Sequence, residues 1–292
     1  MPDFPGNSFR CSLPIPYSIR FGSRLLDLSK PKVMGILNAS PDSFFADSHP
    51  GTTKELLLKA GEMLEFGASI LDLGAASSRP GSIEINDAHE IERLLSFLKP
   101  LRKEFPEALI SIDTFRSSVA SAAIEQGADM VNDISGGQSD PRLPILLARK
   151  QVPYVVMHSR GSFTEMHLEQ VYDNLVVDVI IELQNRIQAA RNSGICDIIA
   201  DPGFGFSKKK EQNFNLLNDL SCFQILDCPI LVGISRKSMI TKTLGINAAD
   251  ALNGTTALHM VALQKGAHIL RVHDVKEAIE TITLFENLCS QE

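Results

Sequence analysis

The most constraining feature of this chain is a series of short apolar, β-branched runs that mostly end in polar residues. The runs and the polar residues after them are Val33–Leu37 with Asn38, Ile70–Leu71 with Asp72, Leu109–Ile112 with Asp113, Asp129–Val131 with Asn132 and Asp133, Tyr154–Met157 with His158, Ile198–Ala200 with Asp201, Ile230–Gly233 with Ser235, Arg236 and Lys237, and His268–Leu270 with Arg271 and His273. Such runs are typical of strands buried on both faces of a parallel sheet. Together with the helix-length segments between them, they predict an α/β fold, a (β/α)8 (TIM) barrel, whose binding residues gather where the strands end.

Helices are expected between these runs, at about 53–66, 87–104, 116–126, 142–149, 168–193, 211–220, 248–265 and 274–288, with an extra turn or two at 237–245. Glycines at 67, 127, 194 and 266 precede runs, where the C-terminal glycine of a helix is expected. Ahead of the barrel, apolar stretches at 17–21 and 25–28 flank Gly22-Ser23, which predicts a hairpin that could cover the bottom of the barrel. We interpret residues 1–292 as one domain, with the barrel at about 32–288.

Composition restricts the function classes. The net charge of −7 argues against a general nucleic-acid binder, and an anionic ligand must be held by a local group of cations. No apolar run approaches the roughly 18 residues of a membrane span, and the start of the chain lacks a signal-peptide pattern. The 5 cysteines form no C-x-x-C pair, so neither a disulfide framework nor a structural zinc site is expected. These features favour a cytoplasmic protein without a membrane partner.

Candidate cations gather at one rim of the predicted barrel. Arg79, Lys237, Arg271 and His273 follow the second, seventh and eighth runs. Such a cluster suits a phosphate or pyrophosphate, and the helix expected to begin near Asp274 would add its N-terminal dipole. The alternative is that Arg271 and His273 only pair with aspartates on the rim.

Acceptor groups gather at the same rim. Asp113, Asn132 and Asp201 end the third, fourth and sixth runs, so they would form a pocket for a flat heterocycle with N–H donors, such as a pterin. The alternative for Asp113 is a cap on the following helix. Asp133 should point away from Asn132, because neighbouring side chains alternate along a strand.

The remaining polar and aromatic candidates lie on rim loops and at strand ends. In Asp201–Phe206, Phe206 is the better candidate for contact with a planar ring, whereas Phe204 is as well explained by packing. His158 has no nucleophile beside it in the pattern and is interpreted as a satisfied polar residue rather than a catalytic one. Asn38 is neutral, so it would bind Mg²⁺ only where substrate phosphates supply most of the oxygens.

Several stretches, in this order, resemble the dihydropteroate synthase family from Lys32 to Ala278. They are Met34–Phe44, Ser77–Gly81, Ser111–Thr114, Val131–Ile134, Asp201–Phe206, Gly233–Ser238 and Arg271–Val275. Each stretch alone is a weak signal, but the set in barrel order is specific. The resemblance implies that 6-hydroxymethyl-7,8-dihydropterin pyrophosphate is joined to p-aminobenzoate with release of pyrophosphate. It also implies a homodimer, and sulfonamides as competitive inhibitors.

The resemblance assigns roles to residues of this chain. It implies that the pterin is held by Asp113, Asn132, Asp201 and Lys237. Magnesium pyrophosphate would be held by Asn38, Ser78, Arg79, Arg271 and His273, with Asn38 as the metal ligand. The p-aminobenzoate pocket would be formed by Ser78, Pro80, Phe206, Ser235 and Lys237. Catalysis would depend on Asn38, Arg79, Lys237, Arg271 and His273.

The chain departs from the family pattern at three positions in two loops. Ala76 stands where many relatives carry an acidic residue, and Ser40 and Ser78 stand where threonine is frequent. We expect loop 75–86 to differ in mobility or in p-aminobenzoate discrimination, with the chemistry retained. Two other interpretations are a corrinoid-linked pterin methyltransferase, which would not need the cationic cluster, and a pterin-binding paralogue without synthase activity.

Overall fold

The computed structural model of the chain describes residues 12–39, 53–75, 86–162, 165, 166, 168 and 170–290. Its main sheet has 8 parallel strands in the order β8-β7-β6-β5-β4-β3-β10-β9, and a bridge between Ala200 and Ile230 joins the two edges. The strands are β3 (Lys32–Asn38), β4 (Ile70–Gly74), β5 (Leu109–Asp113), β6 (Met130–Asp133), β7 (Tyr154–Met157), β8 (Ile198–Asp201), β9 (Leu231–Val232) and β10 (Ile269–Val272). The predicted barrel is confirmed.

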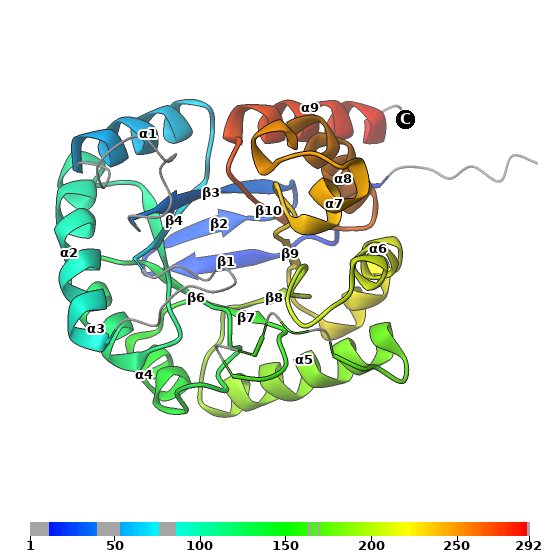
Figure 1. Cartoon of the computed structure of the whole chain (residues 1–292). Helices are drawn as coiled ribbons and strands as arrows, with labels where there is room; N and C mark the ends of the chain where they lie inside the picture. The colour runs from blue at the N-terminus through cyan, green and yellow to red at the C-terminus, as the bar shows by residue number, and fades with distance from the viewer. Residues whose placement is uncertain are drawn as a thin grey trace, which may run out of the picture.

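Helices surround the strands (Figure 1). They are α1 (Thr53–Glu65), α2 (Asp87–Glu104), α3 (Ser117–Glu125), α4 (Arg142–Lys150), α5 (Leu175–Asn192), α6 (Lys210–Asn218), α7 (Ser238–Leu244), α8 (Leu252–Gln264) and α9 (Val275–Cys289), with 3₁₀ turns at Leu220–Leu226 and Ala248–Asp250. The glycines at 67, 127, 194 and 266 all have φ between 92° and 101°, as helix-ending glycines require.

The sequence misplaced the start of α5, which begins at Leu175 rather than at 168. Asn174 ends the preceding loop, because its side chain accepts a hydrogen bond from the amide of Val177 at 3.3 Å and so caps the helix. The 3₁₀ turn at Leu220–Leu226 was not predicted either, and the expected helix at 248–265 is divided into a 3₁₀ turn and α8.

The expected hairpin, β1 (Ser18–Phe21) and β2 (Arg24–Asp27), covers the N-terminal end of the barrel. Ile19, Phe21 and Leu28 pack in one cluster with the first inward-facing residue of most barrel strands. Those residues are Met34, Ile70, Met130, Val155, Ile199, Leu231 and Ile269, and all are buried. The bottom of the barrel is therefore sealed by apolar contacts.

Successive side chains of a strand point alternately into and out of the barrel. This alternation determines which side chains line the interior near the carboxyl ends of the strands. Two residues beyond the apolar layer, β4, β5, β6 and β10 turn Asp72, Ser111, Asn132 and Arg271 into the barrel. Asp133 faces outward and accepts a hydrogen bond from the Tyr154 hydroxyl at 2.6 Å, as its position in the strand predicts. The upper part of the barrel interior is thus polar.

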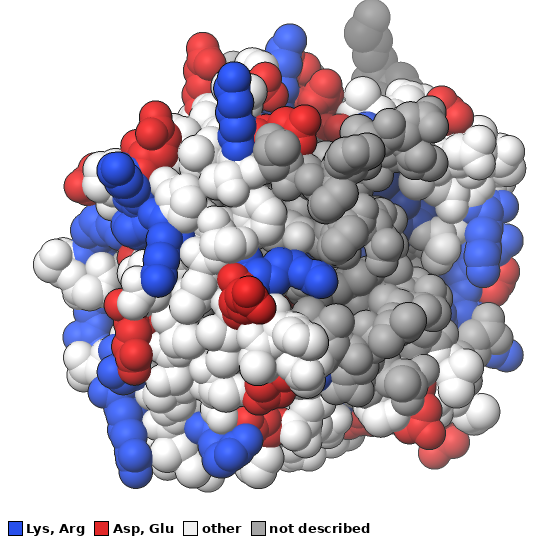
Figure 2. Space-filling view, turned by 60° about the vertical axis from the view of Figure 1, so that its left-hand side comes forward, with Lys and Arg blue, Asp and Glu red and all other residues white. Residues whose placement is uncertain are grey.

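The described surface carries charges of both signs. On the face in Figure 2, basic and acidic side chains of the described residues are interspersed. Cys196, Cys222 and Cys228 are free thiols. Within the described ranges, no helix is long and apolar enough to cross a membrane.

Candidate active site

A network of buried polar groups lies inside the carboxyl end of the barrel. Arg271 donates from Nε to Asp72 at 2.7 Å and from Nη2 to Asp113 at 2.8 Å. The Asn132 amide donates to the same Asp72 oxygen at 3.0 Å. Strands β4, β5, β6 and β10 therefore place one guanidinium, two carboxylates and one amide together, and Asp113 and Asn132 lie together as predicted.

The contacts exclude a helix cap at Asp113 and show which partners Arg271 has in the free protein. Asp113 does not cap α3, because Ser117 donates its amide to Asp140 instead, at 2.9 Å. Burial raises the pKa of Asp113, whereas the nearby Arg271 lowers it. Arg271 is paired with aspartates, as in the alternative interpretation, but its Nη1 makes no hydrogen bond to any residue that the structure describes. Its predicted contact with pyrophosphate stays a prediction.

Asp72 was not among the predicted site residues. It is fully buried, and its Oδ1, like the Ser111 hydroxyl, lacks a hydrogen-bond partner among the described residues. A buried acceptor without a partner costs about 1–3 kcal/mol, so both oxygens are suited to receive N–H donors of a ligand. The available signal was an aspartate within the otherwise apolar strand Ile70–Gly74, in register with Ser111.

Lys237 and Asp201 form a second group beside this network. Lys237 donates from Nζ to the carbonyl oxygen of Phe204, and its ammonium lies 4.7 Å from the centre of the Phe206 ring. Burial lowers the pKa of Lys237 to about 8, although Asp201 opposes the shift. Burial raises the pKa of Asp201, and Lys237 and the Gly203 amide oppose that shift.

The two phenylalanines differ in their surroundings. Phe204 belongs to the main hydrophobic core with no exposed surface, so packing explains it. Phe206 packs with Ile134, Met157 and Met166 at the top of the barrel and faces the Lys237 ammonium. It therefore remains the better candidate for contact with a ring.

His273 and Ser235 are paired at the ends of β10 and β9. Their Nδ1 and Oγ atoms lie 3.0 Å apart. Burial, together with Arg271 and Lys59, lowers the pKa of His273 to about 3. The His273 imidazole is therefore neutral at neutral pH in the free protein, and it offers an N–H donor instead of a positive charge. The expected helix, α9, does begin next to Asp274.

Asn38 ends β3, in register with Gly74 at the end of β4. Among the described residues, no cluster of three or more His, Cys, Asp and Glu could hold a metal ion. A single amide oxygen fits Mg²⁺ only if phosphate oxygens complete its coordination, as the sequence indicated. The predicted residues Ser78, Arg79 and Pro80, and the departures at Ser40 and Ala76, lie outside the described residues.

Comparison with known proteins is consistent with this geometry. A family model described as "Pterin binding enzyme" matches residues 34–273. The folic acid synthesis protein fol1 of Pneumocystis carinii is 42% identical over 84% of this chain, which spans only 34% of that relative. Dihydropteroate synthase of Escherichia coli strain K12 is 36% identical over 89% of this chain and 93% of the relative.

Solved structures agree in fold. Dihydropteroate synthase of Xanthomonas albilineans with 4-aminobenzoic acid is 33% identical and has a TM-score of 0.88, over 95% of this chain and 100% of that one. The Yersinia pestis enzyme in a sulfonamide drug complex is 34% identical, with a TM-score of 0.88 over 93% and 98% of the two chains. The chain belongs to the pterin-binding enzymes and, among them, to the dihydropteroate synthase family of transferases in folate biosynthesis.

Proposed function

We propose that this chain condenses 6-hydroxymethyl-7,8-dihydropterin pyrophosphate with p-aminobenzoate, giving 7,8-dihydropteroate and pyrophosphate. The observation that carries the proposal is the arrangement at the carboxyl end of the barrel. There, a group of buried acceptors lies beside Arg271 and the Lys237 ammonium. The acceptors suit the N–H donors of the pterin, and the cations suit a leaving group whose negative charge grows.

The pterin is assigned to Asp113, Asn132, Asp201 and Lys237, and we add Asp72 because of its unpartnered Oδ1. Carboxylates and amide oxygens accept the several N–H donors of the aminopyrimidinone edge. The unpartnered Oδ1 of Asp72 and hydroxyl of Ser111 support this placement, since a bound heterocycle would offer them donors. These acceptors are preorganised because Arg271 and Asn132 already hold the carboxylates of Asp72 and Asp113.

The pyrophosphate is assigned to Arg271, His273 and Asn38, with Ser78 and Arg79 from loop 75–86. Arg271 would donate from Nη1, and His273 from its ring N–H. Magnesium held by Asn38 and the phosphate oxygens would supply charge neutralisation of the leaving group. The helix dipole of α9 acts in the same direction.

Departure of pyrophosphate leaves a cation at the pterin methylene carbon, which the ring can delocalise. The arylamine nitrogen of p-aminobenzoate is unprotonated at neutral pH, so its lone pair forms the new C–N bond without a general base. The resulting secondary arylammonium is strongly acidic and then releases one proton to water or to the departing pyrophosphate. Loops 39–52 and 75–86 would exclude water, which would otherwise trap the cation.

The p-aminobenzoate pocket is assigned to Phe206, Ser235 and Lys237, with Ser78 and Pro80 from the same loop. Sulfonamides would compete there, since they share the arylamine with p-aminobenzoate. We also propose that Ala76 changes this discrimination. Sulfonamide inhibition of the wild type and of Ala76→Glu should then differ, whereas identical inhibition would remove the role of Ala76.

Two further features complete the proposal. A homodimer is proposed from the family resemblance, through the helices after β8, β9 and β10, and sedimentation velocity would test it. A cytoplasmic location is proposed because the 5 cysteines, an odd number without a C-x-x-C pair, do not suggest a disulfide framework.

The deciding experiment follows pyrophosphate release from dihydropterin pyrophosphate and magnesium, with and without p-aminobenzoate. The proposal expects release that depends on p-aminobenzoate and yields dihydropteroate in equal amount. Tight pterin binding without release would instead indicate a paralogue that lacks synthase activity.

A further inference from the structure

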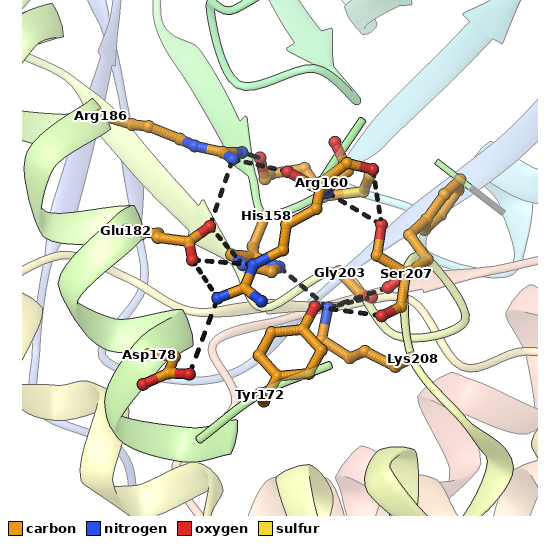
Figure 3. A network of polar contacts seen from close by, with 12 residues as sticks. His158, Arg160, Tyr172, Asp178, Glu182, Arg186, Gly203, Ser207 and Lys208 are labelled. Carbon is orange, nitrogen blue, oxygen red and sulfur yellow. Dashed lines mark hydrogen bonds and ion pairs between the residues drawn. The ribbon is translucent and has the colours of Figure 1, made fainter. Parts of the chain in front are cut away.

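A second polar network lies outside the barrel interior, where the loop after β8 meets α5 and the end of β7 (Figure 3). Its centre is Lys208, which is only 7% exposed. The Lys208 ammonium lies 3.0 Å from the carbonyl oxygen of Gly203, 3.1 Å from that of Phe206 and 3.0 Å from Nδ1 of His158. An ammonium has three donors, so these three acceptors satisfy it completely.

These contacts fix the tautomer of His158. Its Nδ1 must accept from Lys208, so its Nε2 carries the proton and donates to Glu182 at 3.1 Å. Arg160 donates to the other carboxylate oxygen of Glu182, from Nε at 2.9 Å. Burial, and then the Lys208 charge, lower the pKa of His158 to about 3, which keeps the ring neutral. His158 is thus a satisfied polar residue, as the sequence indicated. The structure further shows that its side chain faces away from the barrel interior.

The network holds the loop that carries the candidate site residues. Gly203 donates its amide to Asp201 at 2.7 Å, and Phe206 places its ring beside the Lys237 ammonium. Lys208 binds the carbonyl oxygens at both ends of the turn Gly203–Phe206, while Lys237 binds the one at Phe204. Gly203 has φ 72°, and a Cβ there would overlap the carbonyl oxygen of His158. The loop therefore fits tightly against the His158 segment.

We propose that Lys208 is a positioning residue of the synthase: held by His158, its ammonium fixes the turn Gly203–Phe206, and with it Asp201 and Phe206. The inference rests on the proposed function for the roles of those two residues. Burying an ammonium is costly, and apolar packing usually stabilises a fold equally well. A fully satisfied polar network does give the backbone one defined position, which a binding loop requires.

The first test compares Lys208→Met with Lys150→Met, a change at an exposed lysine on α4. Lys208→Met removes the donors for the loop carbonyls, so KM for p-aminobenzoate should rise about tenfold or more, with a smaller fall in kcat. Lys150→Met should behave as wild type. An unchanged KM in folded Lys208→Met would overturn the proposal.

A matched pair at His158 tests the same idea with little change in volume. The shorter amide side chain that His158→Asn introduces reaches the place of Nδ1 and can still accept from Lys208. The longer amide side chain that His158→Gln introduces reaches the place of Nε2 and keeps only the contact with Glu182. The proposal expects KM within about threefold of wild type for His158→Asn and a rise like that of Lys208→Met for His158→Gln.

Equal effects of the two His158 changes would contradict a positioning role, even if Lys208→Met fails to fold. The proposed function is tested separately, by turnover of the wild type. If the wild type makes no dihydropteroate, the His158 pair is compared by calorimetric titration with dihydropterin pyrophosphate. A tenfold weaker Kd for His158→Gln alone would still support the positioning of Asp201, and equal Kd values would refute it.

Discussion

The two ends of the barrel are formed by the same strands but bury opposite kinds of side chain. At the N-terminal end, Phe21 and its neighbours in the hairpin close the barrel with apolar contacts. At the carboxyl end, the same strands turn Asp72, Asn132 and Arg271 inward, and two buried oxygens lack partners among the described residues. The first end stabilises the fold, and the second gives up stability to leave groups ready for a ligand.

This contrast predicts that substitutions at the N-terminal end of the barrel lower stability and leave catalysis unchanged. Phe21→Ala removes a buried ring from the hairpin cluster, so the free energy of unfolding should fall by about 3–5 kcal/mol. Denaturant unfolding measures that loss. Below the new melting temperature kcat/KM should equal that of the wild type, and a tenfold loss there would mean that the two ends are not independent.

Substitutions at the carboxyl end of the barrel should lower activity and leave stability unchanged or higher. Lys237→Met removes the ammonium beside Asp201, so kcat/KM should fall by about 10²–10³-fold. Stability should hold or increase, because burying an ammonium is unfavourable. Steady-state kinetics and thermal melting measure both effects, with the exposed Lys242→Met as the control. If Lys237→Met lowered the melting temperature and left the specific activity unchanged, Lys237 would serve stability rather than catalysis, which would contradict this comparison.

The activity should also depend on pH, because two lysines at or near the carboxyl end of the barrel have lowered pKa values. Burial lowers the pKa of Lys237 to about 8 and that of Lys208 to about 7, so both lose their charge as the pH rises. Since kcat/KM reports groups of the free enzyme, it should be at least about tenfold lower at pH 9 than at pH 7. A flat profile between these values would show that neither charge is needed.

The smallest expected effect is at the exposed face of the hairpin. Leu25 is 72% exposed, so Leu25→Ala should change the free energy of unfolding by less than about 0.5 kcal/mol. Phe21 and Leu25 lie in the same hairpin but differ in burial. Comparing the loss of unfolding free energy in the two variants therefore shows whether burial or place in the hairpin determines that loss. A loss as large as that of Phe21→Ala would indicate that the hairpin contributes as a unit rather than through its buried face.

The sequence predicted most of this fold because the short apolar runs, their polar ends and the glycines that end helices are local signals. The ends of β5, β6 and β8 placed Asp113, Asn132 and Asp201 at one rim without any knowledge of packing. The N-terminus of α5 was misplaced because hydrophobic periodicity continues into the preceding loop, and only the cap at Asn174 ends it.

What the sequence missed depends on contacts between distant segments. Asp72 joins the site through Arg271, 199 positions away. Lys208 meets His158 across 50 positions, and the neutral state of His273 results from burial and neighbouring cations. Such features follow from the closure of the barrel, which brings together residues that no local pattern connects.

The most direct test of the central claim is calorimetric binding of dihydropterin pyrophosphate to Asp201→Asn and to Phe21→Ala, below their melting temperatures. If the carboxyl end is the ligand site, Asp201→Asn should bind about tenfold more weakly or worse, because a charged acceptor is lost. Phe21→Ala should bind as the wild type does. Equal binding by wild type and Asp201→Asn would contradict the account.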